Sequence, residues 1–224
     1  MIQMSRTGTY EMLVLASLLL FITSSVFCNV IDKTSLTPRE RQWLINFHHC
    51  QRAQVKPPAA NMMYMNYSME LEELAASKLS SCKMAEINKM DIGNYSWNLV
   101  FTVNEIPNIE EFVSAWAHQR RHFENSPNGT CSYCGEYKKI IWATSREMGC
   151  ARKQCENQTI LLCIYFPGGN WRTDSPYIQG SSCSGCGVNV TCTQNQCDLN
   201  PPSGNRLGVM FWGFMAAIFF TFFD

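Results

Sequence analysis

The sequence is poor in charge and has no surplus of either sign. Its 224 residues carry 18 basic and 18 acidic side chains, so the formal net charge is zero. Charged residues make up 16% of the chain, whereas an ordinary soluble domain has roughly 25%. A protein that binds the phosphates of nucleic acid needs lysine and arginine in excess on one face. The balanced charge therefore argues against a nucleic-acid partner.

Histidine is also scarce, with four residues in the whole chain. His118 and His122 are spaced i, i+4, which could hold a metal on a helix. Arg120 and Arg121 lie between them and no third ligand is evident, so a solvated helix face is the better interpretation. The sequence contains no recognisable Ser-His-Asp grouping or general-base pair. We therefore expect that the protein is not an enzyme.

Cysteine, in contrast, is abundant, with 12 residues. A cytosolic chain would keep so many thiols for metal binding or catalysis, whereas a secreted chain uses them in disulfides. An apolar run at 13–22 is followed by small residues, which predicts a signal peptide over residues 1–28, cleaved between Ser25 and Asn29. The alternative is a signal anchor or a buried helix. Loss of Cys28 with the signal peptide would leave an odd number of cysteines.

The chain ends in a second apolar run, which we delimit as a hydrophobic tail at 207–224 after a linker at 199–206. Its 17 uncharged residues would reach about 25 Å as a helix, just short of a typical hydrocarbon core. Ser203 and Gly204 lie before it, where a glycolipid anchor would be attached, although the spacer is shorter than usual. A short transmembrane tail is the alternative. Either way we expect the protein to be tethered outside a membrane.

Five Asn-X-Ser/Thr sequons occur between these two runs. Together with the predicted signal peptide they indicate exposure to the secretory lumen and N-linked glycosylation. The candidate sites are Asn66, Asn94, Asn128, Asn157 and Asn189.

The middle of the chain has helical patterns first and strand patterns later. Thr37 to Glu40 has the form of a capping box with proline at the first helical position. Helical spacing predicts a second helix over 68–82, and a third begins after Asn108 as its cap. The runs at 139–143 and 160–166 are β-branched or aromatic and predict strands. Helices followed by strands indicate an α+β fold.

Several segments carry a resemblance to a known family. They are His48 with Arg52, the segment 55–62 (Val-Lys-Pro-Pro-Ala-Ala-Asn-Met), Gly135-Glu136-Tyr137 with Ile140-Ile141-Trp142, Met148 to Ala151, Cys163 to Asn170, and Pro176-Tyr177 with 183–186. Together they span about residues 36–197 and resemble the CAP superfamily (cysteine-rich secretory, antigen 5 and pathogenesis-related proteins), most of all its glioma pathogenesis-related branch. The resemblance implies an α-β-α sandwich CAP domain over 36–172, followed by a small disulfide-stapled hinge over 173–198.

The resemblance also implies how the cysteines pair. It suggests Cys82 with Cys155, Cys150 with Cys163, Cys183 with Cys192, and Cys186 with Cys197. Cys131 and Cys134 remain in one loop, and we expect them to bond to each other; a redox function is the weaker alternative. Cys50 is then the odd cysteine, and its place on a helix beside Phe47 suggests a buried, inert thiol. The resemblance further makes His48 a structural core residue, with His49 as its surface neighbour.

Many CAP proteins hold a divalent metal such as zinc between two histidines and two glutamates, and this chain has changed all four positions. The first histidine position is Glu86, the first glutamate position is Trp97, the second is Gln119, and the last histidine position is Glu136. An indole supplies no metal lone pair and a neutral amide is a feeble ligand. Two carboxylates could bind a hard cation weakly. We instead expect Glu86 and Glu136 to face solvent in a cleft that Trp97 reshapes, and we expect no cofactor.

These features predict a secreted, tethered CAP-domain interaction protein, and the family suggests cell-surface recognition in reproduction. Its partner would be an extracellular protein or a lipid. A sterol or lipid carrier is the first alternative, because the chain is rich in methionine and aromatic residues, although Met62, Met63 and Met65 lie where core packing is the ordinary explanation. An innate defence protein is the second alternative.

Overall fold

A computed structural model describes residues 35–87, 92–124, 131–170 and 172–200. The predicted signal peptide at 1–28, the hydrophobic tail at 207–224, the anchor candidates Ser203 and Gly204, and the sequon at Asn128 lie outside these ranges. Among the described residues, no helix has the length and apolar character needed to cross a membrane.

Local capping explains where the first helices begin. Helix α2 (Pro38–Ala53) starts at the predicted capping box, in which the Glu40 amide donates to Thr37 Oγ1 (3.2 Å) and the Thr37 amide donates to Glu40 Oε2 (2.8 Å). Helix α5 (Ile109–His118) starts after Asn108, whose Oδ1 accepts from the Glu111 amide at 2.9 Å. Both caps satisfy amides that have no partner within the helix.

The predicted second helix is shorter than expected and the predicted strand at 139–143 is wrong. Helix α3 (Met69–Leu79) ends three residues before Cys82, which has a positive φ of 56°. Helix α7 (Gly135–Ile140) and a turn occupy the supposed strand. The spacing of Tyr137, Ile140 and Ile141, all fully buried, is helical, and over so short a run it outweighs β-branching. Two further short helices are α4 (Met84–Ile87) and α6 (Arg120–Glu124).

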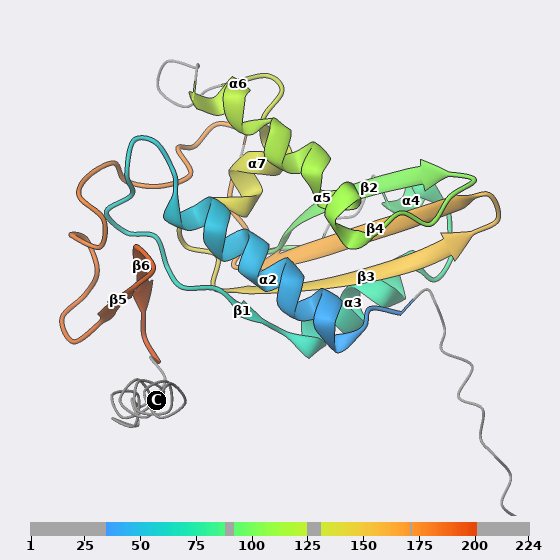
Figure 1. Ribbon diagram of the computed structural model, residues 1–224, viewed down its shortest axis with the longest axis horizontal. Helices are drawn as coiled ribbons and strands as arrows, with labels where there is room; N and C mark the ends of the chain where they lie inside the picture. Colours follow the sequence, from blue (N-terminus) through green and yellow to red (C-terminus); the bar gives the residue numbers. More distant parts are fainter. Residues whose placement is uncertain (1–34, 88–91, 125–130, 171, 201–224) are drawn as a thin grey trace, which may run out of the picture. The chain divides into compact units, whose positions relative to one another are not determined.

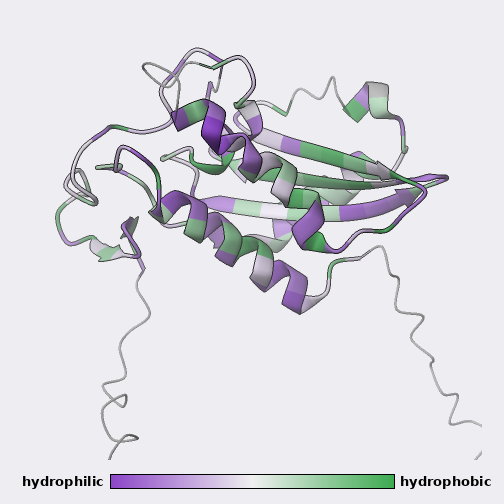
Figure 2. Cartoon of the chain, turned by 45° about the horizontal axis from the view of Figure 1, so that its top comes forward, coloured by the Kyte–Doolittle hydropathy of each residue, from purple (hydrophilic) through white to green (hydrophobic). Residues whose placement is uncertain are grey.

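A four-stranded sheet divides the core into two halves (Figure 1). Its order is β1 (Asn66–Tyr67), β3 (Glu147–Cys155), β4 (Gln158–Phe166) and β2 (Ser96–Val103), and only the β1–β3 pair is parallel. The strand predicted at 160–166 is confirmed as most of β4. Strand β4 is buried on both faces, and it is hydrophobic throughout its centre (Figure 2).

Alternate residues of β4 therefore belong to different halves of the core. Leu161, Cys163 and Tyr165 pack with α2, α5 and α7 on one face, whereas Ile160, Leu162 and Ile164 pack with α3 on the other. The close approach of α3 to β3 requires glycine at 149, because a Cβ there would overlap the backbone of residues 68–72. The α-β-α sandwich that the resemblance implies is thus the fold observed.

Within the described ranges, five disulfides link parts of this architecture, and they join the cysteines that the resemblance and the loop spacing pair. They are Cys82–Cys155, Cys131–Cys134, Cys150–Cys163, Cys183–Cys192 and Cys186–Cys197. The last two hold the hinge, which contains a hairpin of β5 (Thr191–Thr193) and β6 (Gln196–Asp198). Strand β6 is buried against the domain: the Cys197 amide donates to the Met62 carbonyl at 2.6 Å, and the Tyr64 amide donates to the Cys197 carbonyl at 2.9 Å.

Candidate functional site

The position of the family's metal cleft is built around the start of α7. Gln119, the residue that ends α5, donates through Nε2 to Glu136 Oε2 at 2.7 Å. Its Oε1 accepts the amides of Glu136 (3.2 Å) and Tyr137 (3.3 Å). Helix α7 has no side-chain cap of its own at Cys134. The Gln119 amide therefore caps α7 from another helix and at the same time binds the carboxylate that α7 carries.

A buried cation lies one turn further along α7. Lys139 is 7% exposed, and its Nζ donates to the Trp97 carbonyl at 3.0 Å and lies 5.6 Å from the centroid of the Trp97 ring. Burial lowers the pKa of Lys139 to about 8, while the nearby Glu136 carboxylate acts in the opposite direction. We call Trp97, Gln119, Glu136 and Lys139 the cleft network. Lys139 was not identified from the sequence, where it was assigned to a strand.

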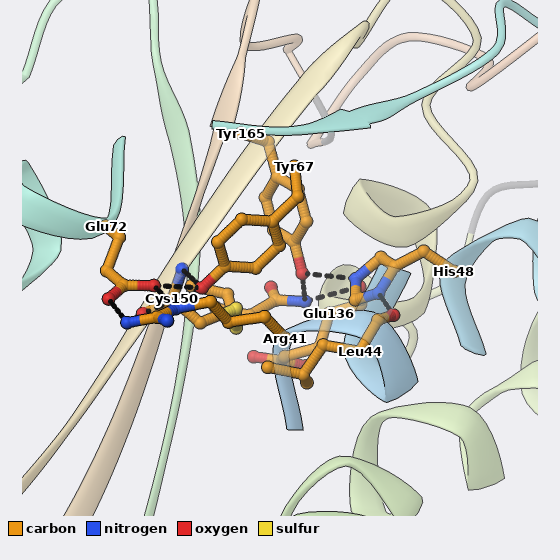
Figure 3. The surroundings of a disulfide bond; sticks show 10 residues. Arg41, Leu44, His48, Tyr67, Glu72, Glu136, Cys150 and Tyr165 are labelled. Atoms are coloured by element: carbon orange, nitrogen blue, oxygen red, sulfur yellow. Dashed lines mark hydrogen bonds and ion pairs between the residues drawn. A yellow bond between two sulfur atoms is a disulfide. The ribbon is translucent and has the colours of Figure 1, made fainter. Parts of the chain in front are cut away.

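A chain of buried polar groups is hydrogen-bonded to the backbone of Glu136, one member of the cleft network (Figure 3). His48 Nδ1 lies 2.8 Å from the Leu44 carbonyl and must donate to it, so Nε2 is left as an acceptor for the Tyr165 hydroxyl at 3.1 Å. Asn98 Nδ2 donates both to the Tyr165 oxygen (3.2 Å) and to the Glu136 carbonyl (2.9 Å). Burial lowers the pKa of His48 to about 3 and raises that of Tyr165, so both are neutral.

These contacts make His48 a structural residue of the core rather than a metal ligand or a base. Both of its ring nitrogens are used inside the protein, and its side chain has no exposed surface. A second group in Figure 3 is also structural: Arg41 on α2 forms an ion pair with Glu72 on α3 at 2.6 Å, and the Tyr67 hydroxyl donates to the same carboxylate.

The four positions of the family's metal site do not form a donor set in this chain. Glu86 is exposed and pairs with Lys83 at 3.0 Å, so it takes no part in the cleft network. Trp97 packs with the apolar residues on the α3 side of the sheet. Glu136 was expected to face solvent, but it is half-buried and bound by Gln119. Across the described ranges, no three or more His, Cys, Asp or Glu side chains gather so as to hold a metal ion.

The chemistry of these groups does not fit a divalent cation. One carboxylate remains in the cleft network, the other oxygen donor is an amide already engaged in hydrogen bonds, and the nearby Lys139 ammonium would repel a second cation. A zinc site needs about four soft or borderline donors around one point. No such point exists among these residues.

Other side chains lie in places that differ from the expectation. His49 is 6% exposed rather than on the surface, because it stacks on Tyr64 with ring centroids 4.1 Å apart and contacts Gln196 of the hinge. Cys50 is exposed, not buried, and it is the free cysteine among the described residues. His118 and His122 are exposed as expected, but they belong to two helices, α5 and α6.

Arg52 is a residue whose task the sequence alone did not reveal. It is 1% exposed, and its guanidinium donates to backbone carbonyls from two segments of the chain, the one before β1 and the one at the end of α7. The acceptors are the carbonyls of Met63, Ile140, Trp142, Ala143 and Ser145, at 2.7 to 3.3 Å. Burial lowers the pKa of Arg52 to about 9. The one signal in the sequence that could have singled out Arg52 is its position four residues after His48, since this pair is among the segments that carry the family resemblance.

The fold and the site together define a disulfide-stapled α-β-α domain in which the family's metal positions hold a hydrogen-bonded network instead of a donor set. The family model of the cysteine-rich secretory protein family, CAP, matches residues 39–165. The chain belongs to this family, and within it the chain is close to the glioma pathogenesis-related branch.

Individual relatives agree with this assignment. Glioma pathogenesis-related protein 1 of Mus musculus is 31% identical over 70% of this chain, and peptidase inhibitor 16 of Homo sapiens is 31% identical over 73%. The chain covers 63% and 37% of their lengths, respectively. Among solved structures, Na-ASP-1 has a TM-score of 0.63 at 21% identity over 75% of this chain and 49% of its own. NaASP2 with Zn2+ has a TM-score of 0.61 at 22% identity over 75% and 98%. These structures share the fold.

Proposed function

We propose that the chain is a secreted, membrane-tethered interaction protein whose CAP domain has neither a cleft metal nor catalytic chemistry. The observation that supports this most is the pairing of Gln119 with Glu136, which uses the remaining cleft carboxylate inside the protein. Lys139 adds a positive charge beside it. A rigid stapled scaffold without cleft chemistry suits recognition through surface loops.

The secreted and tethered state rests on the predicted signal peptide at 1–28 and the predicted hydrophobic tail at 207–224. The four sequon asparagines within the described ranges (Asn66, Asn94, Asn157 and Asn189) all have exposed side chains, as glycan attachment requires. Treatment of expressing cells with a phosphatidylinositol-specific phospholipase tests the anchor. Release of the protein supports a glycolipid at Ser203 or Gly204, and retention supports a spanning tail.

Cell-surface recognition in reproduction is the function that the family resemblance favours. The test is adhesion of sperm to cultured cells that display the full chain, compared with cells that display an unrelated tethered protein. We expect adhesion above the control, unchanged by a zinc-selective chelator because the cleft contributes no metal. Adhesion equal to the control, or adhesion abolished by the chelator, contradicts the proposal.

Lipid carriage remains the alternative, and the methionines do not favour it. Met62 and Met65 are fully buried in the core, so their number reflects packing. A sterol-binding assay with the full chain separates the two functions: binding at micromolar concentration or tighter would favour a carrier. Innate defence would instead appear as damage to microbes exposed to cells that display the chain.

A further inference from the structure

Strand β2 is an edge of the sheet that no other described strand covers. Within the described part of the chain its single strand neighbour is β4. The Asn94 carbonyl and the Asn104 amide point towards β4, since they bond to Gly168 (2.7 Å) and Asn157 (2.6 Å), whereas the Trp97 carbonyl receives Lys139 from the opposite side. In an antiparallel strand, the backbone N–H and C=O groups of successive residues point alternately to the two sides. The odd-numbered residues after Trp97 therefore direct their N–H and C=O groups to the open edge. These residues are Leu99, Phe101 and Val103.

The chemistry of this edge favours pairing with another strand. Residues 96–103 (Ser-Trp-Asn-Leu-Val-Phe-Thr-Val) contain no charge, proline or glycine. Phe101 and Val103 are each 47% exposed, and Ile106 beyond them is 45% exposed. Natural proteins protect such edges with charges, prolines, bulges or a covering element, because a bare edge is a template for a second chain.

Both ends of this strand carry a sequon. Asn94 lies two residues before β2, and Asn157 lies in the turn between β3 and β4, beside the end of β2. Thr159, the third residue of the second sequon, donates to the Glu105 carbonyl at 2.8 Å and fixes the same junction. At about 3.3 Å per residue, the segment from Asn94 to Val103 spans roughly 30 Å. Bulky glycans at its two ends would flank the edge.

Ser96 supplies an independent indication that the first of these sequons is used. Its side chain is 6% exposed, and its hydroxyl has no hydrogen-bond partner within the described part of the chain. A buried unpaired hydroxyl costs about 1–3 kcal/mol, so packing alone would favour alanine here. Ser96 is, however, the third residue of the Asn94 sequon, and its hydroxyl is required for glycosylation of Asn94.

We propose that N-linked glycans at Asn94 and Asn157 cover the open edge of β2 and prevent it from pairing with a second copy of the chain. This inference rests on the glycosylation included in the proposed function and goes beyond it, because it gives two of the five sequons a specific task. The isologous pair that the glycans prevent would join two β2 strands in antiparallel orientation into one continuous sheet.

The experiment compares paired sequon variants of the full chain in cultured mammalian cells. Asn94→Gln/Asn157→Gln removes the two edge glycans. Asn66→Gln/Asn189→Gln removes two others, from β1 and from the hinge, and is the matched control. Two differently tagged copies are co-expressed, and co-capture of one tag with the other measures self-association. Mass spectrometry of glycopeptides measures the occupancy of each site.

We expect wild type and the control to remain monomeric and the edge variant to show at least a doubling of co-capture. A charge placed on the edge, Phe101→Lys, should restore the monomer in the edge variant. If the edge variant is not secreted, endoglycosidase digestion of folded wild-type protein gives the same comparison.

Three results overturn the proposal. Unoccupied Asn94 and Asn157 would contradict the glycosylation itself. Occupied sites with no change in self-association on their removal would contradict only the covering of the edge. Equal self-association in the control variant would show a general solubility effect rather than protection of β2.

Discussion

Arg52 lies where five backbone carbonyls converge, and within the described residues its hydrogen bonds go to these carbonyls rather than to a carboxylate. Guanidinium is the side-chain group that can satisfy so many acceptors at once, since it has five N–H donors in a rigid fork. The residue thus connects α2 to the turn after α7 and to the segment before β1. We therefore expect Arg52 to stabilise the fold rather than to bind a partner.

Arg52→Met should destabilise the domain by about 3 kcal/mol or more, because it leaves several buried carbonyls without donors. Urea unfolding measures the loss. Arg39→Met, an exposed position in the first turn of the same helix, is the control and should change stability by less than about 0.5 kcal/mol. Equal effects of the two substitutions would refute the assignment.

His48 makes stability depend on pH. Its pKa is about 3 in the folded protein and about 6.5 when unfolded, so below pH 6.5 the unfolded state binds the proton first. Stability from His48 is complete above pH 6.5 and is lost towards pH 3, at about 1.4 kcal/mol per pH unit. His49, whose pKa burial also lowers, acts in the same direction.

The unfolding free energy should therefore decrease less between pH 7 and pH 5 in His48→Gln than in wild type. The difference between the two decreases should be about 2 kcal/mol. His122→Gln, at an exposed histidine, should follow the wild-type slope. A wild-type slope in His48→Gln would show that the imidazole is protonated in the folded protein.

Cys50 is the residue for which the expectation of a buried thiol is wrong. The position on α2 beside Phe47 suggested burial, but the helix turns Leu44 and His48 inwards and leaves Cys50 exposed. Iodoacetamide should therefore label the native chain at Cys50, as peptide mapping would show, and Cys50→Ser should abolish the label. Labelling that appears only after denaturation would mean that the thiol is covered.

Among the single elements, helix α7 is one that the sequence predicts only in part. The family resemblance placed Glu136 at a position of the altered site, and the structure brings it together with Gln119. The β-branched run after it was nevertheless taken as a strand, because a six-residue helix offers too few turns for its period to be recognised. Its cap comes from Gln119 on α5, and a contact between distant segments leaves no local signal.

Gln119→Glu, which restores the family's residue, should destabilise this chain at pH 7 by roughly 1–3 kcal/mol. The new carboxylate would face Glu136 where an amide now donates at 2.7 Å, and this repulsion raises the pKa of one of them. A raised carboxyl pKa destabilises at high pH, so the deficit should shrink from pH 7 to pH 4. Gln42→Glu on the exposed face of α2 is the control, and an equal pH dependence there would contradict the repulsion.

For the whole molecule, the resemblance and the cysteine pattern predicted the α-β-α sandwich and the five disulfide pairs. This was possible because motifs in a fixed order and paired cysteines relate segments that lie far apart in the sequence. The extent of contact between the hinge and the domain was not predictable. It depends on backbone bonds between Cys197 and the segment 62–64, and backbone bonds carry no side-chain signature. The open edge of β2 likewise follows only from the strand order.

We propose that the cleft network does not hold a divalent metal. Calorimetric titration of the purified full chain with Zn2+ tests it most directly, with NaASP2, whose structure contains Zn2+, as the positive control. We expect no saturable heat for this chain under conditions in which the control binds. Saturable micromolar binding that Glu136→Gln abolishes would contradict this proposal.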